Sequence, residues 1–279
     1  MLGKIIKHEF KDTYKVMLAV YAAYFLLTII GSSTSYALAK GYSEPNVLTI
    51  SVIVFYVISS IAVYVATFVF ICIRYYKRMF SAHVYLTQTL PVRGVTIFNG
   101  KLIVSTVWMI ISIMFLILSV FFFVNAASEG EAWESITRYT WTEFNRRMYE
   151  ETGVIFTPFF IWFLFEALIG TVVINLWIFT SFAIGQLSDK HKVALSIVTG
   201  MVLYFAFQIF ELFETISAVR ESAGSLNIQS GTDEYAMFMN QMMTSVLLLS
   251  IVTCAVMYAA CIIINKKKFK VLVCLRKNA

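Results

Sequence analysis

The 279-residue chain has few charged residues: Asp, Glu, Lys and Arg make up 14% of it, against roughly 25% in an ordinary soluble domain. It also has only three prolines, three histidines and four cysteines. So little charge excludes a water-soluble globular protein, because 59% of the residues are apolar or aromatic and a wet surface could not accommodate them. The sparse cysteines and histidines form no disulfide framework and no metal-ligand spacing. We therefore expect reduced thiols and no metal site.

Catalytic motifs are also absent from the sequence. His8, His83 and His191 lie far apart, and neither H-E-x-x-H nor G-x-S-x-G occurs. The stretch from Gly94 to Leu102 differs from a phosphate-binding loop, because its glycine spacing is one residue too long and it lacks the final Ser or Thr. We expect a chain that is not an enzyme and that binds no cofactor itself.

The apolar residues gather in six long runs separated by short charged segments. A helix that crosses a hydrocarbon core of about 30 Å needs about 20 mostly apolar residues, and each run is long enough. No run alternates between apolar and polar residues as a barrel strand does, so helices are expected. The sequence thus predicts an all-α integral membrane protein, with one transmembrane domain over residues 1–279. The predicted spans are residues 16–39, 47–73, 102–127, 159–185, 193–213 and 244–264.

Lys and Arg lie mainly on one side of this predicted arrangement. Seventeen of the 22 fall in residues 1–15, 74–101, 186–192 and 265–279. The other five lie in the intervening loops, and the largest of these loops, residues 128–158, has six Glu and three Arg. Short basic loops stay in the cytoplasm, so we expect both termini inside and residues 128–158 outside the cell. The net charge of +6 is therefore interpreted as topological, with no nucleic-acid partner.

The first fifteen residues carry two different faces at helical spacing. One face is apolar, with Leu2, Ile5, Ile6, Phe10 and Tyr14, and another is basic, with Lys4, Lys7, Lys11 and Lys15. This pattern predicts an amphipathic helix at the surface of the lipid bilayer rather than a frayed basic tail.

Three carboxylates lie in or at the edge of the predicted spans. An ionised carboxylate in lipid costs several kcal/mol, so such a residue usually faces protein or water. Glu166 lies about 10 Å along its helix from the outer end, and Glu211 and Glu214 share one face near the outer end of the next span. One interpretation is a substrate cavity formed by Glu166, Gln208, Glu211 and Glu214. The alternative places Glu211 and Glu214 at headgroup level and pairs Glu166 with a neighbouring helix.

A resemblance to a known family rests on two cytoplasmic segments. Residues 74–101 read RYYKRMFSAHVYLTQTLPVRGVTIFNGK. The YLTQTLPV core at residues 85–92, followed by Lys101, resembles the matching loop of type-2 ABC exporter permeases from Gram-positive bacteria. Residues 184–192, with Gly-Gln-Leu and Lys-His-Lys, resemble the turn between the fourth and fifth helices of such permeases.

The resemblance implies a multi-pass permease of the bacterial plasma membrane that exports a drug, a peptide or a lipid. Two permease subunits, identical or similar, would assemble with two separate ATPase subunits, which bind the ATP and Mg²⁺. Residues 74–101 would hold a cytoplasmic coupling helix, with a second contact in the turn before the fifth span. The implied coupling residues are Arg78, Phe80, His83, Tyr85, Leu86, Thr87, Leu90 and Pro91, and those of the turn are Asp189, Lys190, His191 and Lys192.

Two other classes of protein share these features. One is a membrane sensor or accessory protein whose cytoplasmic loop binds a partner without moving a substrate. The other is an ion-driven secondary transporter, which is less favoured because the spans are not broken by Gly or Pro and carry no acid–base pair near mid-membrane. Co-purification with an ATPase whose activity responds to this chain would separate an exporter from both.

Overall fold

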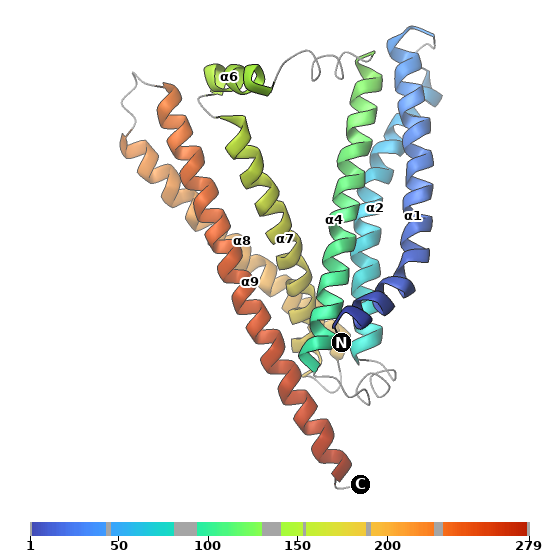
Figure 1. The fold of residues 1–279 in the computed structure, drawn as a ribbon, viewed down its shortest axis with the longest axis vertical. Helices are drawn as coiled ribbons and strands as arrows, with labels where there is room; N and C mark the ends of the chain where they lie inside the picture. The colour runs from blue at the N-terminus through green and yellow to red at the C-terminus, as the bar shows by residue number, and fades with distance from the viewer. Residues whose placement is uncertain are drawn as a thin grey trace. The chain divides into compact units, whose positions relative to one another are not determined.

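The structure is a computed structural model that describes residues 2–42, 46–80, 94–129, 141–152, 155–187, 191–225 and 231–277 (Figure 1). These residues form seven α-helices, and no strand occurs among them. Each helix satisfies its backbone hydrogen bonds within its own segment, as lipid requires. The helices are α1 (Leu2–Ala39), α2 (Val47–Phe80), α4 (Gly94–Ala127), α6 (Trp141–Thr152), α7 (Phe156–Gly185), α8 (Lys192–Ser225) and α9 (Gly231–Lys277).

Six of these helices are long and apolar enough to cross a membrane. The apolar stretches are Leu2–Ala39, Val47–Met79, Gly94–Ala127, Thr157–Gly185, Lys192–Ser217 and Asn240–Ile264. The protein is therefore all-helical over its described part, with the character of a multi-pass membrane protein. At 1.5 Å per residue, the 38 residues of α1 extend about 57 Å, well beyond a hydrocarbon core of about 30 Å. Residues 2–15 thus belong to the same helix as the first predicted span, and Figure 1 shows them bent away from its axis.

Helix α6 lies where the sequence predicts only an extracellular loop. Its side chains meet the first turn of α7 at Thr157. The hydroxyl of Thr157 accepts hydrogen bonds from Trp141 Nε1 (2.9 Å) and Asn145 Nδ2 (2.7 Å). In return, the backbone N–H of Thr157 donates to Asn145 Oδ1 (3.0 Å). Because the first N–H groups of a helix have no partner within it, Asn145 satisfies a donor that α7 itself leaves free.

The chain divides into two compact units. The first unit, Met1–Thr140, contains α1, α2 and α4, and each of these helices packs against the other two. The second unit, Trp141–Ala279, contains the remaining helices, in which α7 packs against α6, α8 and α9, and α8 packs against α9. The two units are described separately below.

The interior of the first unit contains many buried polar side chains. Hydroxyl groups join its helices: Ser112 Oγ on α4 lies 2.7 Å from Tyr21 Oη on α1 and donates to Thr67 Oγ1 on α2 at 2.7 Å. The hydrophobic effect does not drive helices together within lipid, so contacts between membrane helices often consist of small and hydroxyl side chains. The buried stripe of α1 repeats every three or four residues and consists of Glu9, Thr13, Met17, Tyr21, Tyr24, Thr28, Gly31 and Ser35.

Ser119 is a second junction of these three helices. Its Oγ lies 2.8 Å from the Tyr24 hydroxyl, 3.0 Å from the Thr28 hydroxyl and 2.6 Å from the Tyr56 hydroxyl. Gly31 allows α1 to approach the Tyr56 ring closely, because a Cβ at this position would lie 2.8 Å from Tyr56 Cγ. Close packing and shared hydroxyls therefore fix the register of α1, α2 and α4.

An ion pair joins the far ends of α1 and α4. Lys40 Nζ lies 3.1 Å from Glu129 Oε2, one and two residues beyond the helix ends respectively. The hydrogen bond and the charge of Glu129 raise the pKa of Lys40. Both side chains are exposed or nearly so, so this pair contributes little to stability.

Two tight contacts join α7 and α8 in the second unit. A Cβ at Gly185 would lie 2.6 Å from the backbone nitrogen of Ser196, so only glycine fits there without displacing α8. About two turns earlier on α7 the helices are joined again, where Trp177 Nε1 donates to the Gly200 carbonyl at 2.9 Å.

Candidate functional site

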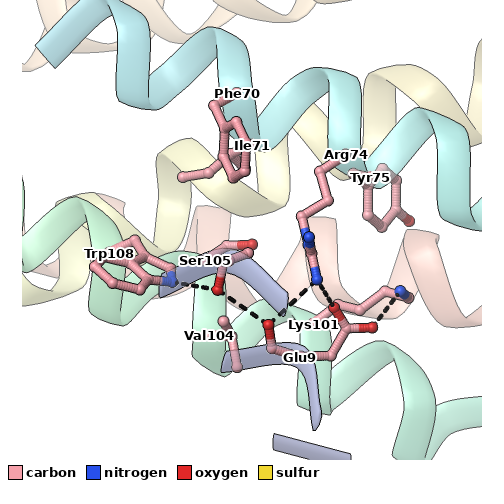
Figure 2. Close-up of a pocket in the computed structure, with 10 residues that line it drawn as sticks. Glu9, Phe70, Ile71, Arg74, Tyr75, Lys101, Val104, Ser105 and Trp108 are labelled. Carbon is pink, nitrogen blue, oxygen red and sulfur yellow. Dashed lines mark hydrogen bonds and ion pairs between the residues drawn. The ribbon is translucent and has the colours of Figure 1, made fainter. Parts of the chain in front are cut away.

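The best-defined polar site of the first unit surrounds the carboxylate of Glu9, on α1. Lys101 Nζ, on α4, donates to Oε1 at 2.8 Å, and Arg78 Nη1, on α2, lies 3.1 Å from the same oxygen. Arg74 Nη2, one turn earlier on α2, donates to Oε2 at 2.9 Å. Figure 2 shows Arg74 and Lys101 approaching Glu9 from different helices. One carboxylate therefore joins three helices through three cations.

A second acid completes the site. Asp12, also on α1, accepts a short hydrogen bond from Arg78 and lies 3.8 Å from Arg74 Nη2. We call Glu9, Asp12, Arg74, Arg78 and Lys101 the ionic cluster. It contains two carboxylates and three cations, so its formal charge is +1 with both acids ionised.

The centre of the ionic cluster is removed from water. The side chain of Lys101 is 6% exposed and that of Glu9 is 10% exposed, whereas Arg78 and Asp12 are 35% and 48% exposed. Removing a charge from water costs several kcal/mol, and a partner at hydrogen-bonding distance offsets that cost. Loss of Glu9 would leave Lys101 as an uncompensated buried charge, whereas loss of Lys101 would leave Glu9 paired with Arg74 and Arg78. The stability of the cluster therefore depends on Glu9 more than on any other member.

Local sequence explains how these groups meet. Glu9, Asp12 and Thr13 share a face of α1 because they are three and four residues apart, and Arg74 and Arg78 share a face of α2 for the same reason. Helices α1 and α4 also approach each other closely at Gly100 of α4, where a Cβ would lie 2.8 Å from Cγ2 of Ile5 on α1.

Two aromatic side chains, Trp108 and Phe10, lie beside the ionic cluster. The Trp108 indole donates through Nε1 to Thr13 Oγ1 at 2.9 Å, and the ring of Phe10 stacks on it at 4.8 Å between centroids. A small cavity of about 20 Å³ lies between Arg74, Lys101 and Trp108, which is room for one water molecule (Figure 2). The site is thus suited to holding charges in fixed positions rather than to enclosing an organic ligand.

Most of the predicted coupling residues fall outside the described part of the chain. They are His83, Tyr85, Leu86, Thr87, Leu90 and Pro91, and in the second cytoplasmic turn Asp189 and Lys190. Arg78 is described, and it lies in the ionic cluster. Phe80 is the last residue of α2. His191 precedes α8, Lys192 is its first residue, and both are exposed.

Three of the four residues of the predicted substrate cavity take part in side-chain hydrogen bonds in the second unit. Glu166 Oε1, on α7, accepts a hydrogen bond from Ser250 Oγ on α9 at 2.7 Å. Gln208 Nε2 donates to Glu211 Oε2 on the same helix, α8, at 3.3 Å. Glu214 makes no side-chain hydrogen bond with the described residues.

One oxygen of Glu166 stands out. Its Oε2 is shielded from solvent and has no hydrogen-bond partner among the described residues. Glu166 lies seven residues after the start of the predicted span, so its carboxylate is inside the apolar part of α7. A buried carboxylate oxygen with no partner is costly, which makes Glu166 the strongest functional candidate of the second unit.

Sequence reasoning missed the ionic cluster. It placed Arg78 and Lys101 in the cytoplasmic coupling segment before the third span, and it placed residues 1–15 in an amphipathic helix at the surface of the bilayer. A usable signal was present, because Glu9 and Asp12 are the only acids in the first fifteen residues and Arg74 and Arg78 stand one turn apart. In the helical ranges described here, no group of three or more His, Cys, Asp or Glu residues could hold a metal ion.

Comparisons with known proteins returned nothing for this chain: no family model matches it, and no curated protein or solved structure is significantly similar to it.

Proposed function

We propose that this chain is the membrane-spanning permease subunit of an ATP-driven ABC exporter. It moves a drug, a peptide or a lipid-like substrate outward, and ATP and Mg²⁺ are bound and used by a separate ATPase subunit. Six apolar helices of membrane-spanning length and the YLTQTLPV segment support this proposal. A second permease subunit, identical or similar, completes the complex in the bacterial plasma membrane.

The observation that carries the proposal is the position of the ionic cluster. Residues 81–93 connect α2 to α4, and the cluster binds both helices next to this connection. Arg78 is two residues before the end of α2, and Lys101 is seven residues after the start of α4. Both contact Glu9, so the two ends of the connection and α1 are held together.

This arrangement suits transmission of movement. A soluble partner that displaces residues 81–93 would move α1, α2 and α4 as one body, because the ionic cluster joins them, rather than bend one helix alone. A rigid body converts a small cytoplasmic displacement into a shift across the membrane. An ATPase that closes on ATP supplies such a displacement.

The second unit offers the substrate contacts in this proposal. Glu166 and Ser250 bring polar groups of α7 and α9 together at membrane depth. A second candidate function, an ion-driven transporter, draws on the same Glu166, whose buried Oε2 could take up a proton or a cation. Dependence on ATP rather than on the proton gradient separates the two.

The test is a reconstituted complex. The tagged chain is purified from the membranes of its own cells, and we expect an ATPase subunit to co-purify with it and the complex to hydrolyse ATP in proteoliposomes. Phe80→Ala with Tyr85→Ala should release the ATPase or uncouple its hydrolysis from transport, because buried aromatic anchors dominate such contacts. The matched control is Phe25→Ala with Tyr36→Ala, which removes the same two residue types from exposed positions of α1. A double variant that keeps a fully coupled ATPase would refute the coupling assignment, and absence of any ATPase partner would refute the exporter.

A further inference from the structure

Four lysines of α1 form one exposed face. Lys4, Lys7, Lys11 and Lys15 are three or four residues apart, so they return to the same side of the helix at each turn, and all four are exposed. We call them the lysine face. It lies on the side of α1 turned away from Glu9, which is buried.

The acidic side chains near the lysine face are paired within the ionic cluster, so they do not neutralise the lysines. Glu9 and Asp12 are the only carboxylates in residues 2–15; Arg74 and Arg78 bind both of them, and Lys101 binds Glu9. The negative charge of these residues is thus neutralised by α2 and α4. The four lysines form no ion pair with a described residue.

Two apolar side chains of residues 2–15 also face the protein. Ile5 fills the space over Gly100, and Ile6 packs against the buried cluster that contains Met17 and Trp108. The segment is therefore held on the protein by its apolar and acidic side chains. It does not need to insert an apolar face into lipid, as an isolated amphipathic helix would.

The lysine face continues directly into the exposed apolar face of the same helix. After Lys15 the three-to-four spacing reaches Leu18, Phe25 and Ile29, which are 62%, 48% and 50% exposed. Exposed apolar residues on a membrane-spanning helix face hydrocarbon or another membrane helix. The change from lysine to leucine on one face therefore marks the boundary between hydrocarbon and headgroups.

We propose that the lysine face binds the headgroups of anionic phospholipids in the leaflet that surrounds this end of the first unit. Continuity with the apolar face favours lipid over an acidic soluble protein, because it places the lysines beside the bilayer. The inference goes beyond the proposed exporter and does not depend on it. Each lysine close to an anionic surface strengthens binding roughly fivefold, and salt weakens the effect.

The experiment uses the full-length protein in detergent, equilibrated with equal amounts of phosphatidylglycerol and phosphatidylcholine. Native mass spectrometry measures the ratio of the two lipids that stay bound. We expect the wild type to retain phosphatidylglycerol at least about fivefold over phosphatidylcholine. The variant with Lys4→Gln, Lys7→Gln, Lys11→Gln and Lys15→Gln should bring that ratio close to one, and the four Lys→Arg changes should preserve it.

A matched control removes the same amount of charge elsewhere. Lys40→Gln, Arg146→Gln, Arg147→Gln and Arg220→Gln eliminate four cations on the opposite predicted side of the membrane, and the lipid ratio should stay at the wild-type value. Circular dichroism of each variant reports whether the helices are intact. An unchanged ratio in a folded Lys→Gln variant would overturn the proposal. Loss of a co-purifying acidic protein from that variant, with the lipid ratio unchanged, would assign the lysine face to a protein instead.

Discussion

Lys101 Nζ lies 2.8 Å from Glu9 Oε1, although 92 positions separate the two residues in the chain. The contact closes the N-terminal part of α1 onto the start of α4, and both side chains are almost completely buried. It is therefore the point at which loss of one group should affect the whole first unit.

We expect Glu9→Gln to lower the free energy of unfolding by about 3 kcal/mol. The variant removes the negative charge and leaves Lys101 buried without compensation. Titration of the detergent-solubilised protein with a denaturing detergent measures this change. Glu129→Gln is the control, because its pair with Lys40 is exposed and should contribute little to stability. Equal effects of the two variants would show that the ionic cluster does not stabilise the unit.

Ser119→Ala should cost about 1 to 2 kcal/mol of unfolding free energy. The hydroxyls of Tyr24, Thr28 and Tyr56 all lose a shared partner, and each such bond within a membrane contributes roughly 0.6 kcal/mol on average. The same unfolding titration applies. Ser33→Ala should be nearly neutral, since that exposed hydroxyl bonds only to a carbonyl of its own helix.

Gly185→Ala should destabilise the second unit by about 1 to 3 kcal/mol, the usual range for overpacking. The added methyl group would collide with the backbone of Ser196 and push α8 away from α7. Gly170→Ala is a matched control on the same helix, because nothing lies within 4 Å of its Cβ position. That control should be neutral or more stable by up to about 1 kcal/mol, as expected for alanine in a helix. A neutral Gly185→Ala would contradict the close approach.

Topology can be tested by thiol labelling of intact cells, in a background without the native cysteines. A cysteine in place of Glu143, in α6, should react with an impermeant reagent added outside. A cysteine in place of the exposed His191 should react only after the cells are opened. The reverse pattern would reject the orientation inferred from the distribution of Lys and Arg.

Glu166→Gln should change substrate-stimulated ATPase activity of the reconstituted complex while leaving its assembly intact. The substitution keeps the size of the side chain and its contact with Ser250 but removes the charge at membrane depth. Glu214→Gln, at the predicted outer edge of the next span, is the comparison and should have a smaller effect. Normal transport by a fully assembled Glu166→Gln complex would make Glu166 structural.

The sequence was sufficient for the helical class because the apolar runs are long enough to be recognised one at a time. It could not show that Glu9 meets Lys101, since periodicity reports which side of a helix is buried but not which helix covers that side. Helix α6 was missed for another reason. Eight of its twelve residues are polar or charged, so it gives no hydropathy signal, and so short a helix depends on tertiary contacts such as those with Thr157.

The long separation between Glu9 and Lys101 also has a consequence for biogenesis. A ribosome that adds about 5 to 20 residues per second needs several seconds to reach Lys101 after it has made Glu9. During that interval α1 enters the bilayer without Lys101, and Glu9 can pair only with Arg74 and Arg78, which are synthesised earlier. The ionic cluster is therefore complete only after α4 has been inserted, which makes its closure a late step in the assembly of the first unit.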